Sequence, residues 1–390
     1  MYFMLGLTPW QWGLSIIFLV SLFVQLYFYL HYYLQPTYRI NDEKKQRIHY
    51  LSELPPVSVV IYANNDSEQL RNNLEYFLTQ DYPEFEIIVV NDGSSDESED
   101  VLSEFEAKFS NLYHTFVAEG ARNLSRRKLS LTLGIKAARY DIVLLSDANC
   151  RPGSNRWIYS FARNFTEKTD LVIGCTILEK HKGLFERLTS FDVLLHNLRF
   201  IGYALSNKPY MGEGTNLAYR KSLFFAHKGF AKFMQLHTGD DDLFVNQVAN
   251  RRNTKIELSA DSRMTAIYES NIEGWLYQKR NRAFTSSFYK TGAKMSYAFD
   301  SFTRFLYYGC GIAVIILSWP ILWLCITIMS FMLIRFVLTG LFWRRTGKIF
   351  NTRRFFFLVP FLELIDPLIN IYFKLESYID RKQNYTWRFQ

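Results

Sequence analysis

Residues 85–96 read FEIIVVNDGSSD, and this stretch decides the fold. Residues 87–90 are four consecutive large apolar side chains, which is typical of a strand buried on both faces of a parallel sheet. Short polar residues around Gly93 follow at once, and they suit a sharp turn and a helix cap. Open α/β sheets bind ligands outside the carboxyl ends of their strands, so Asp92 lies where a ligand is expected. An ordinary strand–turn–helix corner has the same pattern, so other motifs are needed to choose between the two.

Strand and helix patterns alternate on both sides of this stretch. Residues 57–62 (VSVVIY) and 141–145 (DIVLL) are two more buried-strand patterns, and residues 67–80 carry apolar side chains at helical spacing. This βαβ spacing predicts an α/β domain with a doubly wound, mostly parallel sheet. We expect this domain to occupy residues 56–300.

The composition limits the partners. The 390 residues carry a net charge of +8, and the four cysteines form no CxxC pair. A zinc site or a disulfide framework is therefore not expected. A basic chain could bind nucleic acid, but in a chain with membrane spans a surface facing anionic lipid is the simpler explanation. We expect a lipid bilayer as partner and no nucleic acid.

Residues 1–34 are expected to form an N-terminal transmembrane anchor. Residues 13–30 are largely apolar and are flanked by Trp and Tyr residues, as in a membrane-spanning helix. The cations at 39–47 follow this helix, so the positive-inside rule places the next domain in the cytoplasm. Residues 35–55 are expected to be a juxtamembrane linker. A cleaved signal peptide is disfavoured, because there is no basic n-region and no small-residue cleavage site.

Residues 301–390 are expected to form a C-terminal membrane region. From residue 305 to 338 the only charge is Arg335, and a basic loop follows at 343–354. If the α/β domain and this loop are both cytoplasmic, the run must cross the membrane twice as a helical hairpin. The next apolar run contains Glu363 and Asp366, which are costly in lipid, so a re-entrant or interfacial segment is favoured over another span. The predicted location is the inner (plasma) membrane, multi-pass, with the α/β domain in the cytoplasm.

Carboxylates follow three segments of the predicted domain: Asp92, Asp147 and the run Asp240 to Asp242, with Lys128 between the first two. Such a set suits a nucleoside diphosphate bound through Mg²⁺ or Mn²⁺, with a further carboxylate acting as a base. Each Asp taken alone could equally be a helix N-cap.

Taken together, the motifs resemble a membrane-anchored family 2 glycosyltransferase with the GT-A fold. In chain order they are VSVVIYANND, QDYPEFEIIVVNDGSSD, SRRKLSLTLGIKAA, DIVLLSDANC, GEGTNLAYR and TGDDDLF. The resemblance implies an inverting enzyme that moves a sugar from a nucleotide-sugar donor, with a UDP-sugar preferred, to a lipid-linked or glycan acceptor. It also implies a divalent cation, Mg²⁺ or Mn²⁺, at the cytoplasmic face of the membrane.

The resemblance assigns the donor nucleotide to several residues. Asp92 would contact the base or ribose. Ala63, Asn65 and Asp66, in the loop after the first strand, would line the nucleotide. Lys128 would reach the nucleotide or its phosphates.

The same resemblance assigns the metal and the base. Asp147 and Asn149 of the SDAN motif would hold the metal and the diphosphate, and Asp147 would also contact the donor. Asn149 stands where the family has a second Asp, which predicts weaker metal binding. The catalytic base is expected at Asp242, with Asp241 as the next choice, because the register of three successive Asp residues is ambiguous.

The motif QKRNR at 278–282 stands where processive polysaccharide synthases have Gln-x-x-Arg-Trp. Arg280 and Arg282 would bind the diphosphate leaving group, although juxtamembrane charges on lipid headgroups are an alternative. The Trp is absent, which disfavours a processive synthase without excluding it. Glu213 and Asn216 would shape the acceptor pocket, or would only form a Gly-dependent turn. A catalytically inactive homologue acting as a membrane scaffold is the remaining alternative.

Overall fold

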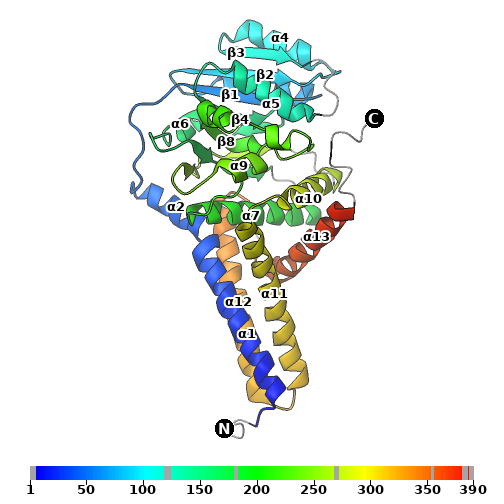
Figure 1. Ribbon diagram of the computed structural model, residues 1–390. Helices are drawn as coiled ribbons and strands as arrows, with labels where there is room; N and C mark the ends of the chain where they lie inside the picture. The colour runs from blue at the N-terminus through cyan, green and yellow to red at the C-terminus, as the bar shows by residue number, and fades with distance from the viewer. Residues whose placement is uncertain are drawn as a thin grey trace.

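The computed structural model describes residues 6–117, 124–179, 183–267, 272–352 and 355–379, together with residue 385. An α/β domain stands on a stalk of long helices, and two further helices lie crosswise between domain and stalk (Figure 1). The site described below lies where these parts meet.

A seven-stranded sheet forms the centre of the domain. Its strands, in spatial order, are β3 (Leu112–Phe116), β2 (Phe85–Asn91), β1 (Val57–Ala63), β4 (Ile142–Asp147), β8 (Leu217–Arg220), β6 (Leu171–Ile173) and β9 (Thr254–Ile256). All neighbours are parallel except that β8 runs antiparallel to β4 and β6. A smaller sheet has the order β5 (Cys150–Pro152), β10 (Met264–Ala266) and β7 (Thr176–Leu178). The predicted mostly parallel sheet is confirmed.

Alternate side chains of the central strands enter two separate cores. Val59 and Ile61 of β1 pack with one set of helices, whereas Val60 points to the opposite face and packs with another. A strand between two helical layers must be largely apolar on both faces, which explains why Ser58 is the only small polar residue of β1. The first set is α3 (Ser67–Leu78), α4 (Ser98–Lys108) and α6 (Trp157–Ala162). The second is α5 (Arg126–Ala137), α7 (Leu184–Leu205) and α9 (Asp242–Val248).

The remaining short elements are α8 (Lys221–Ala226) and 3₁₀ turns at Gly214–Asn216, Ala231–Phe233 and Phe356–Leu358. Strand register places the turns of the site side by side. Tyr62 of β1 pairs with Val90 of β2 on one side and with Asp147 of β4 on the other. The three strands therefore end at one edge of the sheet, although their turns are far apart in sequence.

Three helical runs are long and apolar enough to cross a membrane: residues 9–44, α11 (Thr291–Leu317) and α12 (Leu322–Ile349). The first consists of α1 (Pro9–Phe28), a π-helical turn (Tyr29–Tyr33) and α2 (Gln35–Lys44), so the expected linker begins as a helix. α11 and α12 form the predicted hairpin, with 27 and 28 residues. Both helices extend beyond the uncharged run at 305–338, so neither is short for a span.

α13 (Val359–Ile379) lies against α10 (Ile272–Ser286) and is not among the candidate spans in the described part of the chain. Its carboxylates are paired with cations of other helices. Glu363 lies 3.0 Å from Arg335 of α12, and Asp366 lies 3.1 Å from Arg199 of α7. Charges buried in this way need partners, because an unpaired carboxylate in an apolar setting is costly.

Candidate active site

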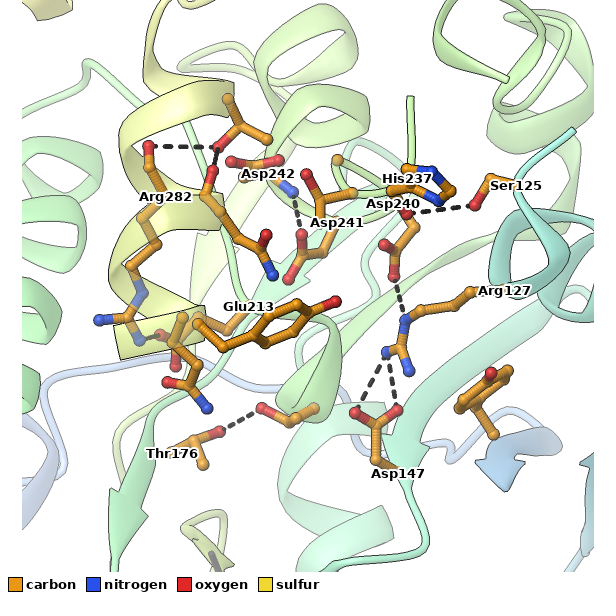
Figure 2. Close-up of a pocket in the computed structure, with 18 of the residues that line it drawn as sticks. Ser125, Arg127, Asp147, Thr176, Glu213, His237, Asp240, Asp241, Asp242 and Arg282 are labelled. Carbon is orange, nitrogen blue, oxygen red and sulfur yellow. Dashed lines mark hydrogen bonds and ion pairs between the residues drawn. The ribbon is translucent and has the colours of Figure 1, made fainter. Parts of the chain in front are cut away.

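A cavity of about 1220 Å³ opens between the carboxyl edge of the sheet and the crosswise helices α7 and α10. Carboxylates and cations face one another across it (Figure 2). Of the residues predicted from the sequence, those that line it are Asp92, Asp147, Glu213, Asp241, Asp242 and Arg282. The structure thus brings the three distant acidic segments into one cleft.

Asp92 is held by two side chains at the end of β2. The Tyr62 hydroxyl donates to its Oδ2 at 2.8 Å, and Arg126 Nε donates to its Oδ1 at 3.1 Å. Gly93 has a φ of +62°, and a Cβ at this position would lie 2.5 Å from Arg126 Nη2. Only glycine allows both this turn and the close approach of the guanidinium.

Arg127 bridges two of the acidic segments. Its Nε donates to Asp240 Oδ2 at 2.8 Å, and its Nη2 donates to both oxygens of Asp147 at 2.8 and 3.1 Å (Figure 2). The guanidinium also lies 4.5 Å from the centre of the Tyr62 ring. Although burial opposes it, Arg127 lowers the pKa of Asp240, whereas burial outweighs Arg127 and raises the pKa of Asp147. Arg127 is therefore the main cation of this end of the cavity.

Lys128 differs from the expectation. Its side chain is fully buried, and its Nζ donates to the carbonyls of Leu236 and Thr238 at 2.6 and 2.7 Å. Helical geometry turns Lys128 away from the cavity while Arg126 and Arg127 face it. Lys128 thus stabilises the loop that leads to Asp240. Burial lowers the pKa of Lys128 to about 8. The structure gives it no direct access to the cavity.

The three successive residues Asp240, Asp241 and Asp242 lie in different environments. Asp241 accepts the backbone N–H of Asp242 at 2.7 Å and that of Gly214 at 2.8 Å, so both its oxygens serve the backbone. Burial and the neighbouring Asp residues raise its pKa to about 8. Asp242 accepts the Tyr289 hydroxyl at 2.6 Å on Oδ2, while its Oδ1 has no hydrogen-bond partner among the described residues. Burial raises the pKa of Asp242, and Asp240 adds to this.

Glu213 and Arg282 close the membrane side of the cavity. Arg282 Nη2 donates to Glu213 Oε1 at 3.1 Å (Figure 2), and His196 Nε2 lies 3.4 Å from the same oxygen. Burial raises the pKa of Glu213 against the effect of Arg282. Burial lowers the pKa of His196, and Arg282 lowers it further, which disfavours the charged imidazolium.

The predicted donor loop lies beside the cavity rather than in its wall. Ala63 is fully buried, and its carbonyl accepts the Asp92 N–H at 2.9 Å. Asn65 has a φ of +54°, and its Oδ1 accepts the Ser95 N–H at 2.8 Å. Asp66 accepts the Asn64 N–H at 2.8 Å. Among these neighbours only Asn64 lines the cavity.

Three other predicted residues also lie outside the cavity wall. Asn216 is 1% exposed and holds Trp157 Nε1 at 2.9 Å, with its own amide donating to Cys175 and Ser262 carbonyls, so its role is structural. Asn149 is not part of the lining. Arg280 reaches Glu376 of α13 at 3.0 Å with half of its side chain exposed.

Sequence reasoning missed Arg126, Arg127, Asp240 as an ion-pair partner, and Tyr289. The motif SRRK contains three successive cations. The sequence alone does not show which of them turn toward the cavity when the helix packs on the sheet. Nothing in the sequence marked Tyr289, which meets Asp242 only through the packing of the chain after α10 against α9. Tertiary packing thus assembles the cavity around turns that the sequence predicts.

A carboxylate-rimmed cavity at the edge of a mostly parallel sheet, next to helices long and apolar enough to cross a membrane, is the arrangement expected of a membrane-anchored glycosyltransferase. The chain belongs to glycosyl transferase family 21, whose model matches residues 14–389. The resemblance to glycosyltransferases is thereby confirmed, with family 21 matching where the motifs suggested family 2.

Individual relatives match parts of the chain. The probable glycosyltransferase YdaM of Bacillus subtilis is 29% identical over 183 residues, which is 44% of this chain and 42% of YdaM. A poly-β-1,6-N-acetyl-D-glucosamine synthase of Staphylococcus epidermidis is 33% identical over 93 residues, 24% of this chain and 21% of the synthase. The matches thus span less than half the length of these curated relatives.

A solved structure matches nearly the whole chain. The mannosyltransferase PcManGT of Pyrobaculum calidifontis, solved in complex with GDP-Man and Mn²⁺, has a TM-score of 0.55 and 14% identity. The similarity covers 94% of this chain and 99% of that one. At this identity it establishes a shared fold, and the predicted GT-A fold is confirmed.

Proposed function

We propose that this protein transfers a sugar from a nucleoside diphosphate sugar to an acceptor hydroxyl at the membrane surface, with inversion at the anomeric carbon. The observation that carries this proposal is the meeting of two kinds of group in one cavity. Arg126 and Arg127 supply fixed positive charge at the sheet edge, and Asp242 presents a carboxylate from another element.

The sheet-edge end of the cavity suits the donor. Asp92 would contact the base or ribose of the nucleotide. Arg127 would exchange its carboxylate partners for the diphosphate, since an Arg fork suits phosphate oxygens. A UDP-sugar is the preferred donor, and GDP-sugars belong in the same test, because the mannosyltransferase of this fold was solved with GDP-Man.

The residues at the sheet-edge end of the cavity could supply some of the ligands of a divalent cation. Within the described residues no group of three or more His, Cys, Asp or Glu side chains could hold a metal by itself. Mg²⁺ and Mn²⁺ bound with nucleotides need only one or two carboxylates besides the phosphates. Asp147 and Asp240 would fill that role once Arg127 turns to the diphosphate. The bound cation would neutralise charge on the leaving diphosphate.

The transfer is a single displacement. The acceptor oxygen forms a bond to the anomeric carbon while the bond from that carbon to the diphosphate oxygen breaks, and the electron pair leaves with the diphosphate. Asp242 takes the acceptor's proton. Its raised pKa favours this step, and Asp241 is less suited because both its oxygens accept backbone N–H groups. Arg127 and Arg282 stabilise the departing charge.

We place the reaction at the cytoplasmic face of the inner membrane, with a lipid-linked or glycan acceptor. The candidate spans lie beneath the α/β domain (Figure 1), and the cationic segment after the first span supports this orientation. The similarity to a polysaccharide synthase favours a processive reaction as the second candidate. Ala283 and Phe284 in place of the Trp of those synthases argue against it.

The test is a thermal-shift screen of UDP-, GDP- and other nucleotide sugars with the full chain in detergent, with and without Mn²⁺. A donor bound only by the folded state at about 100 times its Kd stabilises the protein by about 2.7 kcal/mol. The donor found should then release its nucleoside diphosphate in the presence of membranes. No stabilisation by any nucleotide sugar, together with no release, would refute the proposed activity and favour the scaffold alternative.

A further inference from the structure

Arg127 lies where a metal ion would be expected at the sheet-edge end of the cavity. Its guanidinium lies between two carboxylates from different segments, with Nε 2.8 Å from Asp240 Oδ2 and Nη2 2.8 and 3.1 Å from the two oxygens of Asp147 (Figure 2). Carboxylates are the protein ligands that Mg²⁺ and Mn²⁺ prefer when they bind together with phosphates. The positive charge that these two side chains require is therefore supplied by the chain itself.

A guanidinium and a divalent cation cannot share this position. Arg127 already contacts both oxygens of Asp147 and one oxygen of Asp240. An ion bound by the same oxygens would lie against a like charge with little water to screen it, because the two carboxylate side chains are only 19% and 8% exposed. A metal ion can bind here only after Arg127 has turned away.

Arg127 can turn, whereas the two carboxylates are held in place. The side chain of Arg127 is 27% exposed and lines the cavity. Asp147 is the last residue of β4 in the middle of the sheet. The loop that leads to Asp240 is tied to α5, because Lys128 Nζ donates to two carbonyls of residues 236–238. The part that moves is therefore one side chain in the cavity wall.

Tyr62 connects Arg127 with the proposed position of the nucleotide. Its hydroxyl donates to Asp92 Oδ2 at 2.8 Å, and its ring centre lies 4.5 Å from the guanidinium carbon of Arg127. A nucleotide that contacts Asp92 would thus bind beside this arginine. Since an Arg fork suits phosphate oxygens, the diphosphate would compete with the carboxylates for the guanidinium.

The charges at this end balance when donor and cation bind together. With both carboxylates ionised, Asp147, Asp240 and Arg127 carry a single net negative charge. The diphosphate of a nucleotide sugar adds two negative charges and the divalent cation adds two positive ones, so that joint binding leaves the net charge unchanged. Either one alone would add uncompensated charge beside largely buried carboxylates, which is costly.

We propose that Arg127 is an internal cation that excludes the metal ion while no donor is bound, and that the donor's diphosphate admits the metal by drawing the guanidinium away from Asp147 and Asp240. Metal and donor would then bind as a pair, and the metal alone would bind weakly. This inference rests on the proposed function for the nature of the donor, whereas the exclusion of the metal by Arg127 can be measured without any turnover.

The experiment measures Mn²⁺ binding by electron paramagnetic resonance, with the full chain in detergent after treatment with a chelator. The wild type should bind Mn²⁺ about tenfold or more tightly with UDP or GDP than without, once the Mn²⁺ held by the nucleotide in solution is subtracted. Equal affinity for Mn²⁺ with and without each nucleotide would overturn the proposal.

Variants test the role of the arginine itself. Arg127→Leu removes the competing charge and should bind Mn²⁺ without nucleotide about tenfold or more tightly than the wild type. Arg126→Leu is the matched control on the same helix, because Arg126 pairs with Asp92 instead, and it should not gain Mn²⁺ binding. Adding Asp240→Asn to Arg127→Leu should remove the gain and thereby locate the ion.

Arg127→Lys keeps the test valid if Arg127→Leu does not fold. The lysine retains the charge but lacks the fork that contacts two carboxylates at once, so this variant should also bind Mn²⁺ more tightly than the wild type when no nucleotide is present. The absence of any gain in a folded Arg127→Leu or Arg127→Lys protein would overturn the proposal.

Failure of this inference differs from failure of the proposed function. If a nucleotide sugar stabilised the protein while neither nucleotide nor Arg127 affected Mn²⁺ binding, the internal cation would be refuted and the sugar transfer would stand. If no nucleotide sugar stabilised the protein or released its diphosphate, the proposed function would fail, and the release of Arg127 by a donor would fail with it.

Discussion

The sheet-edge end of the site and the helical region on the other side of the cavity, which we call the membrane end, are built in different ways. At the sheet-edge end, Asp92 follows β2, Asp147 is the last residue of β4 and Asp240 precedes α9, and Arg126 and Arg127 pair with them. At the membrane end, the pairs join segments that are far apart in the chain, and most of these segments are helices. Arg282 meets Glu213, Lys279 of α10 meets Asp192 of α7, and Arg335 meets Glu363.

The difference lies in what each set of charges stabilises. The sheet-edge charges face a large cavity, so a ligand can replace their partners. Most membrane-end charges are enclosed by helices: Asp300, Arg304, Arg335 and Glu363 are each at most 3% exposed. Charges of the first kind are available for chemistry, whereas those of the second kind hold helices together in a setting without water.

The largest expected effect comes from Asp242→Asn. The variant keeps the shape and the Tyr289 contact and removes the proton acceptor, so the turnover rate should fall by about 10²–10⁴-fold. Donor binding should stay within about twofold, because the donor groups lie at the sheet-edge end. Nucleoside diphosphate release and calorimetric donor titration measure the two. Asp147→Asn is the matched comparison and should weaken donor binding instead. Normal turnover by Asp242→Asn would move the base to Asp240 or Asp241.

The next effect tests the buried pair of the membrane end. Arg335→Leu leaves Glu363 enclosed with the Tyr29 and Tyr308 hydroxyls alone, and should destabilise the protein by about 3–5 kcal/mol. Adding Glu363→Leu to it should restore much of the loss. Thermal unfolding in one detergent compares these variants with Arg127→Leu, whose side chain is 27% exposed. Arg127→Leu should lower donor affinity with a smaller loss of stability. Equal losses would mean that the two ends do not differ.

The same contrast explains what the sequence could predict. Strands such as β1 and β2 are mainly apolar runs, and the turn after each is polar, so the local sequence predicted the sheet and its acidic edge. The run at 305–338 likewise indicated a helical hairpin. α7 was not predicted, since its 22 residues mix apolar and polar side chains around a helix covered on several sides.

The sequence predicted the membrane end only in part. Glu213 and Arg282 lie 69 residues apart and pair through packing, which no local pattern encodes. For Asn216, in the Gly-rich turn, the sequence left open a pocket role and a purely structural role. The structure shows the structural role, because its Oδ1 accepts Trp157 Nε1 and its Nδ2 donates to two carbonyls. Lys128 shows the same limit at the other end. The motif SRRK predicted cations at this end of the site. The orientation of α5 in the fold decides that Arg126 and Arg127 face the cavity and that Lys128 does not.

Lys128 gives a smaller effect that depends on pH. Its pKa in the folded protein is lowered to about 8 from 10.5, so between these values the unfolded chain binds more protons. Stability should therefore rise with pH across this window, by at most about 1.4 kcal/mol per pH unit, and Lys128 should add no pH slope below pH 8, where it is protonated in both states. Lys128→Met should remove this slope. If the stability curves of the two proteins ran parallel from pH 8 to 10.5, burial would not lower the pKa of Lys128, and the prediction would be wrong.

The smallest expected effect separates the two arginines that the motif QKRNR placed together. Arg280 points to Glu376 with 51% of its side chain exposed, and such surface pairs contribute about 0.2–1 kcal/mol. Arg280→Ala should therefore change kcat/KM by less than about twofold, whereas Arg282→Ala removes a cation from the cavity wall and should lower it by about tenfold or more. Donor and acceptor titrations of both variants measure this. Since the two residues are neighbours on one helix, equal losses would mean that α10 turns when substrate binds and brings both arginines to the diphosphate, and the membrane end would then be mobile rather than fixed.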